Sequence, residues 1–225
     1  MREPREGYED VFPNAGYAPW LTDLEFQAAY NEIKGNTLVD IYRCYELWTL
    51  SRQTLKRVGG CVVEVGVYRG GTAALLGLAT CHLNRTLYAC DTFQGVAKAG
   101  ENDWWYKGGE FSDTSMEYVQ QFINVFDLSA VRLIRGIFPE GVPPFDLPSG
   151  KIAFAHVDVD TYLSAKDTTE WIWNRLNPGG CVVFDDYGFR STSGVTKFVN
   201  EFAHDNNTCS LIHNLNGHGI LTRLW

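Results

Sequence analysis

The stretch that decides the fold is Cys61-Val62-Val63-Glu64-Val65-Gly66-Val67-Tyr68-Arg69-Gly70-Gly71-Thr72. Its first five residues form a short, mostly apolar run that predicts a buried β-strand, and residues 72–81 predict a helix. The glycines between the two elements allow the backbone to turn tightly and a ligand to approach the main chain. This order of strand, glycine-rich turn and helix is typical of one unit of a parallel α/β sheet.

Strands and helices alternate along the rest of the chain. Further strands are predicted over residues 86–90, 131–134, 152–157 and 181–184, with two short strands near the C-terminus. Further helices are predicted over residues 37–55, 115–126, 164–176 and 194–204. Because the strands are continuously apolar, we expect a doubly wound α/β fold, in which helices cover both faces of a mostly parallel sheet. Residues 37–225 then form one domain, and residues 1–36 an irregular, aromatic arm or lid over it.

Composition excludes several classes of protein. The chain has 225 residues, with 19 Lys and Arg against 27 Asp and Glu, and its net charge of -8 argues against nucleic-acid binding. No apolar run approaches the roughly 18 residues that span a membrane. Residues 1–6 lack the apolar core of a signal peptide, so we expect a cytoplasmic protein. None of the six cysteines is spaced as C-x-x-C, which favours free thiols over disulfides or zinc.

Residues at the carboxyl ends of the strands are candidates for a site, because ligands of open α/β sheets bind there. Asp91 follows the second strand, where a carboxylate suits the hydroxyls of a ribose. The spacing from Gly66 is G-x-x-x-G-G, preceded by Glu64, and differs from the G-x-G-x-x-G that binds a diphosphate. A ribose without a diphosphate indicates S-adenosylmethionine.

Acidic residues follow two further strands. Asp158 and Asp160 end one strand, and Asp185 and Asp186 end the next. Adjacent strands lie about 4.8 Å apart, so the four carboxylates should converge at one edge of the sheet. Two such charges about 4 Å apart repel by roughly 4 kcal/mol at an effective dielectric constant of 20. An all-oxygen cluster favours a hard cation, with Mg²⁺ first and Ca²⁺ or Mn²⁺ behind it.

These motifs, in this order, resemble one known family. The similarity covers most of residues 37–205 and rests on residues 37–40, 64–71, 91–95, 136–140, 156–162, 178–180 and 185–187. The family is that of the TylF/MycF-type sugar O-methyltransferases of macrolide and aminocoumarin biosynthesis, which depend on S-adenosylmethionine and Mg²⁺. The resemblance implies the Rossmann-like fold of class I methyltransferases and a role in tailoring a natural product.

The resemblance also implies roles for particular residues. Asp158, Asp185 and Asp186 would bind Mg²⁺, and Asp160 would act as the general base. The residues that would contact the cofactor are Glu64, Gly66, Val67, Tyr68, Arg69, Gly70, Thr72, Asp91, Thr92, Phe93, Ser112, Gly136 and Asp158. The aromatic run 104–106 would either stack on the acceptor or pack as a lid, and His156 is expected to be a buried residue rather than a ligand.

Other functions remain open on the sequence. The acceptor is expected to be a small molecule, glycosylated or sugar-like, with no nucleic-acid or membrane partner and a possible homodimer. A metal that binds two neighbouring hydroxyls would serve a catechol-like phenol equally well. A nucleotide-binding oxidoreductase is disfavoured by the absence of G-x-G-x-x-G. A calcium-stabilised binding module without catalytic activity is the third alternative.

Overall fold

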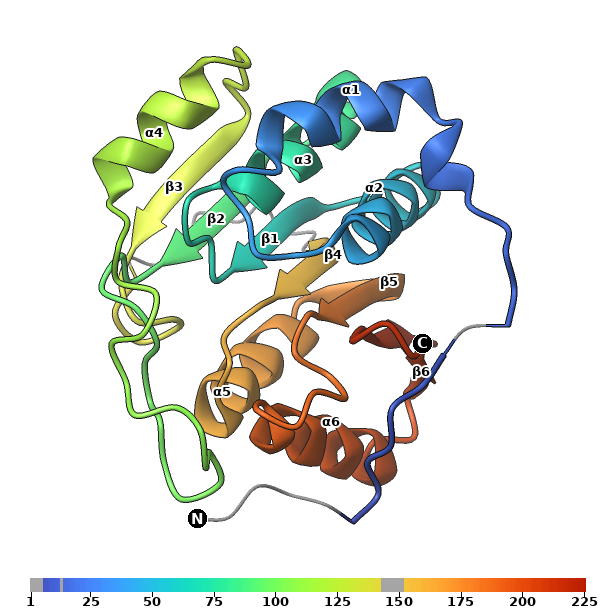
Figure 1. Ribbon diagram of the computed structural model, residues 1–225, viewed down its shortest axis with the longest axis vertical. Helices are drawn as coiled ribbons and strands as arrows, with labels where there is room; N and C mark the ends of the chain where they lie inside the picture. The colour runs from blue at the N-terminus through green and yellow to red at the C-terminus, as the bar shows by residue number, and fades with distance from the viewer. Residues whose placement is uncertain (1–5, 13, 143–151) are drawn as a thin grey trace.

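The computed structural model describes residues 6–12, 14–142 and 152–225 (Figure 1). They form a seven-stranded sheet in the order β3-β2-β1-β4-β5-β7-β6. The strands are β1 Cys61–Val65, β2 Leu87–Asp91, β3 Val131–Arg135, β4 Ile152–Val157, β5 Leu176–Phe184, β6 Cys209–His213 and β7 Gly219–Arg223. Strands β1 to β5 pair in parallel, and β7 pairs antiparallel with both β5 and β6. The predicted doubly wound, mostly parallel sheet is confirmed.

Helices cover both faces of this sheet. The helices are η1 Pro19–Leu21, α1 Leu24–Ile33, α2 Ile41–Leu55, α3 Gly71–Thr80, η2 Cys81–Leu83, α4 Met116–Asn124, α5 Tyr162–Trp173 and α6 Ser193–Asp205. Successive residues of β1 point to opposite faces: Val62 packs in the core shared with α1, α2 and α3, and Val63 in the core shared with α5 and α6. No helix in the described part of the chain is long and apolar enough to cross a membrane.

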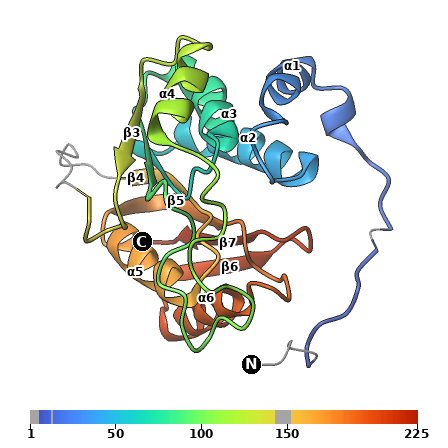
Figure 2. The same cartoon turned by 60° about the vertical axis from the view of Figure 1, so that its left-hand side comes forward.

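The N-terminal segment differs from the expectation. Residues 24–33 fall in the stretch expected to be irregular, but they form α1, whose Phe26 and Ile33 are fully buried in the core with α2 and α3. This helix is therefore part of the domain core rather than a lid. The described residues before η1 run as an extended chain along the outside of the molecule (Figure 2), where Asp10 contacts Arg190 at 3.1 Å. Residues 1–5 and 13 of the predicted arm lie outside the described residues.

Two helix starts also differ from the prediction. The helix expected from Thr37 begins at Ile41, because the carboxylate of Asp40 accepts hydrogen bonds from the backbone N–H groups of Tyr42 and Arg43 at 2.9 and 3.0 Å. Residues 37–39 are left free to line a pocket. The helix expected over 164–176 begins at Tyr162 and ends at Trp173, and residues 177–180, which lie between that helix and the strand expected over 181–184, belong to β5.

A crevice opens where the order of strands reverses. The chain leaves β1 for α3 on one face of the sheet and leaves β4 for α5 on the other, so the two connections diverge at the carboxyl ends of these neighbouring strands. Gly66 follows β1 directly, with φ of +90°. A Cβ atom at this position would lie 1.6 Å from the carbonyl oxygen of Asp158, so only glycine fits between the two strand ends.

The first prediction concerns Gly66→Ala. The variant should unfold more readily than Gly109→Ala by about 2 kcal/mol or more, because forced overlap of this size requires the backbone to move. Gly109 is a matched control, since its φ is +89° and a Cβ there would meet nothing within 4 Å. Urea denaturation measures both. Equal stability of the two variants would contradict the close approach of β1 and β4.

Candidate active site

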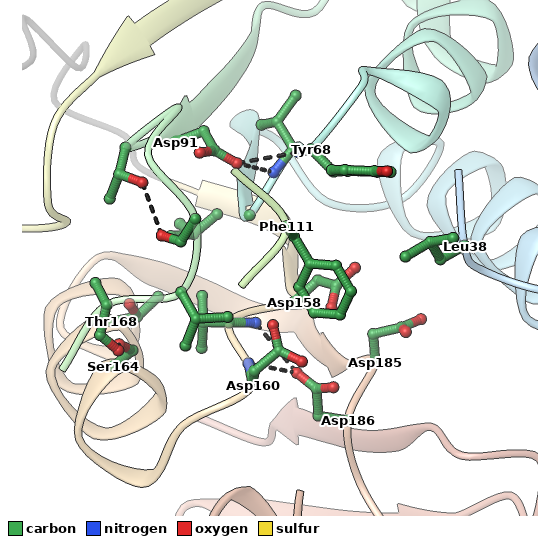
Figure 3. A pocket seen from close by; sticks show the side chains of 18 of the residues that line it. Leu38, Tyr68, Asp91, Phe111, Asp158, Asp160, Ser164, Thr168, Asp185 and Asp186 are labelled. Carbon is green, nitrogen blue, oxygen red and sulfur yellow. Dashed lines mark hydrogen bonds between the residues drawn. The ribbon is translucent and has the colours of Figure 1, made fainter. Parts of the chain in front are cut away.

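One pocket lies across the carboxyl ends of the central strands (Figure 3). Its first end is formed by the turns after β1 and β2, including Gly66, Tyr68 and Asp91. Its second end is formed by the residues after β4 and β5, which are acidic. The α2 side contributes residues 37–39 and Arg43, and the long loop after β2 contributes Tyr106 and Phe111. The pocket therefore joins the two sets of residues that the sequence singled out.

The carboxylate of Asp91 is fixed by the turns around it. Its Oδ2 accepts hydrogen bonds from the N–H groups of Val67 at 2.6 Å and Tyr68 at 3.0 Å, and its Oδ1 accepts one from Phe93 at 2.6 Å. A carboxylate has about four acceptor positions, so three backbone donors hold Asp91 and leave capacity for a ligand hydroxyl. This geometry is compatible with the predicted role of Asp91 toward a ribose.

The predicted cofactor residues divide into two groups. Those that line the pocket are Gly66, Val67, Tyr68, Thr72, Asp91, Thr92, Gly136 and Asp158. Glu64, Gly70 and Phe93 are not among the lining residues and lie close behind it. Glu64 is fully buried with an oxygen 3.0 Å from Nδ1 of His156, Gly70 precedes α3 with φ of +87°, and Phe93 supports Asp91 through its N–H.

Arg69 and Ser112 lie apart from the pocket. Both border a shallow depression on the neighbouring surface. Arg69 forms an ion pair there with Asp113, whose carboxylate also accepts a hydrogen bond from the hydroxyl of Tyr68 at 3.2 Å. In the described structure these two residues therefore do not share the pocket with the other predicted cofactor contacts.

The acidic residues converge as predicted. One carboxylate oxygen from each of Asp158, Asp185 and Asp186 lies within 4.8 Å of the others. Oδ2 of Asp186 accepts hydrogen bonds from the N–H groups of Val159 at 3.1 Å and Asp160 at 2.8 Å. Asp160 has φ of +61°, an unusual conformation for a residue with a side chain, so this bond helps to hold a strained turn. The acidic turns after β4 and β5 are thus joined to each other.

Burial and mutual repulsion make three of these carboxylates reluctant to ionise. Burial, followed by the charges of Asp185 and Asp186, raises the pKa of Asp158 well above its usual range. Burial and the charge of Asp160 do the same to the pKa of Asp186. The pKa of Asp160 rises to about 6, because burial and neighbouring carboxylates outweigh a hydrogen bond from Tyr106. A positive charge in the pocket would lower the pKa of all three carboxyl groups.

Asp185 differs because it already has basic neighbours. Burial opposes its ionisation, but the nearby rings of His156 and His218 and the charge of Arg43 outweigh that effect and lower its pKa. Arg43 comes from α2, forms an ion pair with Asp185 and is held by Asp40 at 2.8 Å. Nothing in the sequence near Asp185 indicated this partner, since 142 residues separate the two.

The donor set fits the predicted Mg²⁺. It consists of carboxylate oxygens, which Mg²⁺ prefers, and among the described residues that line the pocket Arg43 is the only Lys or Arg beside the four acidic residues at this end. Asp158, Asp185 and Asp186 would hold the ion.

The aromatic loop supplies a functional residue whose role the sequence left undecided. Tyr106 is only 8% exposed, lines the pocket and hydrogen-bonds through its hydroxyl to Asp160. Its neighbour Trp104 donates its indole N–H to the backbone oxygen of Arg190 at 2.7 Å, which fastens the loop, and Trp105 is exposed. Of the run 104–106, Tyr106 is therefore the residue that lines the pocket and reaches the predicted general base, whereas Trp104 and Trp105 are not among the lining residues.

Comparison with known proteins agrees with the fold. The fold is that of a class I methyltransferase: the chain superposes on the O-methyltransferase NovP with a TM-score of 0.72 at 25% identity, over 84% of this chain and 83% of that one. It superposes on the calicheamicin methyltransferase CalS11 with a TM-score of 0.70 at 19% identity, over 96% and 99% of the two chains. A more distant neighbour of the same fold, TomG of Streptomyces achromogenes, was solved with S-adenosylmethionine (TM-score 0.53, 16% identity, 90% and 91% of the chains).

The family follows from the sequence. Residues 33–223 match the model of the macrocin-O-methyltransferase (TylF) family, and the chain belongs to that family of methyltransferases. A curated relative, demethyldecarbamoylnovobiocin O-methyltransferase of Streptomyces niveus, is 31% identical over 142 residues, which are 58% of this chain and 53% of the relative. The chain thus matches about half the length of such relatives. The predicted resemblance is confirmed.

The second prediction concerns stability and pH. Because the pKa of Asp160 is raised to about 6 in the folded protein, its contribution is most favourable below the usual pKa of about 4 and is lost as the pH rises through about 6. The stability of Asp160→Asn minus that of the unmodified chain should therefore increase as the pH rises from about 4.5 to about 7.5. We expect an increase on the order of 1–2 kcal/mol after allowing for partial exposure.

Urea denaturation at both pH values, with a chelator present, measures this difference. Asp205→Asn is the control, because Asp205 is exposed at the end of α6 and far from the cluster in the fold. A difference that is the same at both pH values would contradict the raised pKa of Asp160.

Proposed function

We propose that this protein is an O-methyltransferase that uses S-adenosylmethionine and Mg²⁺ to methylate a hydroxyl of a sugar moiety on a small natural product. The observation that carries the proposal is the joining, in one pocket, of a ribose-compatible turn at Asp91 and the acidic cluster of Asp158, Asp185 and Asp186. Membership of the TylF family supports it. Cytoplasmic location, a homodimer and the absence of nucleic-acid and membrane partners stay predictions.

In the proposed reaction, bound S-adenosylmethionine supplies an electrophilic methyl group, and bound Mg²⁺ supplies a Lewis acid for the acceptor hydroxyls. The chain orients both. Asp91 and the turn after β1 would hold the cofactor at one end of the pocket. The carboxylates of Asp158, Asp185 and Asp186 would hold the metal at the other end. Correct positioning of reactants of this kind contributes on the order of 7–11 kcal/mol in good intramolecular systems.

Asp160 is the proposed general base. It borders the metal ligands without being counted among them, and its pKa of about 6 allows it to be ionised near neutral pH and to take a proton. Tyr106 is a positioning residue in this proposal, since its hydroxyl donates to the carboxylate of Asp160 and directs it. Arg43 holds Asp185 in its ionised form.

The third prediction tests the general base. Asp160→Asn should bind S-adenosylhomocysteine nearly as well as the unmodified chain but lose roughly 100-fold or more in kcat, the usual contribution of a general base. Calorimetry with S-adenosylhomocysteine, with and without Mg²⁺, measures binding, and methyl transfer is assayed on a panel of sugar diols and catechols. Asp205→Asn is again the matched control. Unchanged turnover in Asp160→Asn would refute the role, and transfer only to catechols would refute the acceptor class.

The fourth prediction concerns Tyr106→Phe. Loss of one hydrogen bond to a carboxylate should lower kcat about 10-fold while KM for S-adenosylmethionine stays unchanged, because the ring still fills its place in the loop. Steady-state kinetics separates the two constants. A change in KM for S-adenosylmethionine with kcat unchanged would indicate that Tyr106 acts on cofactor binding rather than on Asp160.

A further inference from the structure

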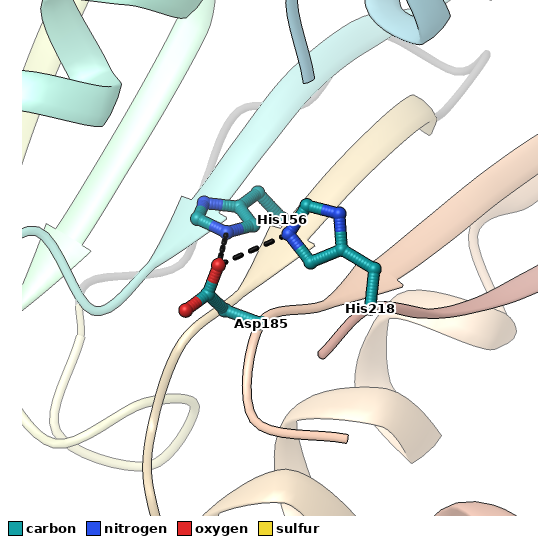
Figure 4. Close-up of side chains that lie close together, drawn as sticks. All are labelled: His156, Asp185 and His218. Carbon is teal, nitrogen blue, oxygen red and sulfur yellow. Dashed lines mark hydrogen bonds and ion pairs between the residues drawn. The ribbon is translucent and has the colours of Figure 1, made fainter. Parts of the chain in front are cut away.

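A second cluster of possible metal ligands is formed by Asp185 and two histidines (Figure 4). It consists of His156 in β4, Asp185 after β5 and His218 directly before β7. All three residues are buried, and one ligand atom from each lies within 4.8 Å of the others. Asp185 lines the pocket but the two histidines do not, so the histidine side of this cluster lies away from the surface at which the acceptor would bind.

The two imidazole rings point at the same carboxylate oxygen. Nε2 of His218 lies 3.0 Å from Oδ1 of Asp185, and Nε2 of His156 lies 3.7 Å from it. The second distance is too long for a hydrogen bond, and no other described group hydrogen-bonds to this nitrogen, although the ring is fully buried. A buried nitrogen without a hydrogen-bond partner needs an explanation. Because this one faces Nε2 of His218 and Oδ1 of Asp185, which can both bind a metal, a bound ion among the three atoms would explain it.

The opposite edge of each ring is held by a carboxylate. Oε1 of Glu64 lies 3.0 Å from Nδ1 of His156, and Oε2 of Glu46, from α2, lies 2.6 Å from Nδ1 of His218. Metal-binding histidines characteristically donate their second ring N–H to a carboxylate, which fixes the ring and leaves the other nitrogen free to coordinate. Both histidines of this cluster have that arrangement.

The carboxylates around the two rings favour a positive charge at this place, carried either by a protonated ring or by a bound cation. Glu46, Glu64 and Asp185 surround the two rings, and Arg43 forms its ion pair with the other carboxylate oxygen of Asp185, Oδ2. Oδ1 is therefore the oxygen that faces the histidines. Two imidazole nitrogens and one carboxylate oxygen suit Zn²⁺ and similar transition metals, whereas Mg²⁺ prefers oxygen throughout.

We propose that His156, His218 and Asp185 form a binding site for one divalent transition-metal ion, with Zn²⁺ as the best match. The ion would displace any proton from Nε2 of each ring and would cross-link the ends of β4, β5 and β7. Asp185 would be shared between this site and the proposed Mg²⁺ site, one oxygen toward each. The site goes beyond the proposed methyl transfer and does not depend on it.

The test uses the full chain after removal of metals with a chelator. Zn²⁺ is titrated by calorimetry, and Co²⁺ serves as a probe whose visible absorption reports nitrogen ligation. We expect one equivalent of Zn²⁺ to bind and to raise the melting temperature. His218→Gln and His156→Gln should each weaken binding by 100-fold or more, and Glu46→Gln, which keeps all three ligands, by about 10- to 100-fold. His204→Gln, at an exposed position, is the matched control and should bind as the unmodified chain does.

Asp186→Asn separates the two metal sites, because it removes a proposed Mg²⁺ ligand and leaves the histidine cluster intact. It should retain Zn²⁺ binding. The proposal is overturned if the unmodified chain binds no Zn²⁺, or if binding survives both histidine substitutions; its loss in Asp186→Asn would then place the ion at the acidic cluster. Should a histidine variant fail to fold, Glu46→Gln and the Co²⁺ spectrum of the unmodified chain decide. Methyl transfer without Zn²⁺ binding would refute this site and leave the proposed function standing.

Discussion

Repulsion among carboxylates at one edge of the sheet is the constraint that organises the rest of the molecule. Parallel β4 and β5 end side by side, so the acids that follow them cannot separate without breaking the sheet. Other segments supply the positive charge and the hydrogen-bond donors that stabilise these carboxylates. Arg43 comes from α2, Tyr106 from the loop after β2, and the N–H groups of residues 159 and 160 reach Asp186.

The acidic residues of the site are therefore held by contacts with helices and strands from several parts of the fold. Asp185 alone contacts a helix on one face of the sheet through Arg43 and the last strand pair through His218. Asp91 is fixed by the turn after β1, and Gly66 admits the close approach of β1 and β4 that brings the two ends of the pocket together. The chemistry of the pocket is therefore a property of the sheet topology rather than of one loop.

The parallel sheet and the meeting of the acidic residues at its edge were predictable from the sequence, because both follow from short stretches of the chain. Continuous apolar runs predict buried parallel strands, and the residues that follow such strands must share an edge, so the positions of Asp158 and Asp185 after their strands suffice to place them together. Helix α1 was missed because Gly and Pro near it suggested irregular chain, although Phe26, Ala29 and Ile33 have helical spacing and are buried.

The partners of the acids could not be predicted, since they come from residues remote in the chain. Arg43 is 142 positions from Asp185, and His218 reaches it only because β7 inserts antiparallel beside β5. Neither pairing leaves a signature in local spacing. Similarly, a strand-to-helix turn points some residues inward and others outward, and the motif alone did not separate Tyr68, which lines the pocket, from Arg69, which does not.

The late position of β7 has a consequence for biosynthesis. His218 and the strand that follows it are made after the other strands, yet β7 inserts between β5 and β6. Until this strand arrives, Asp185 lacks one of its buried neighbours and β5 has an open edge. A nascent chain that has already folded its first five strands thus has Asp185 without its contact to His218, and this contact forms only once β7 has left the ribosome.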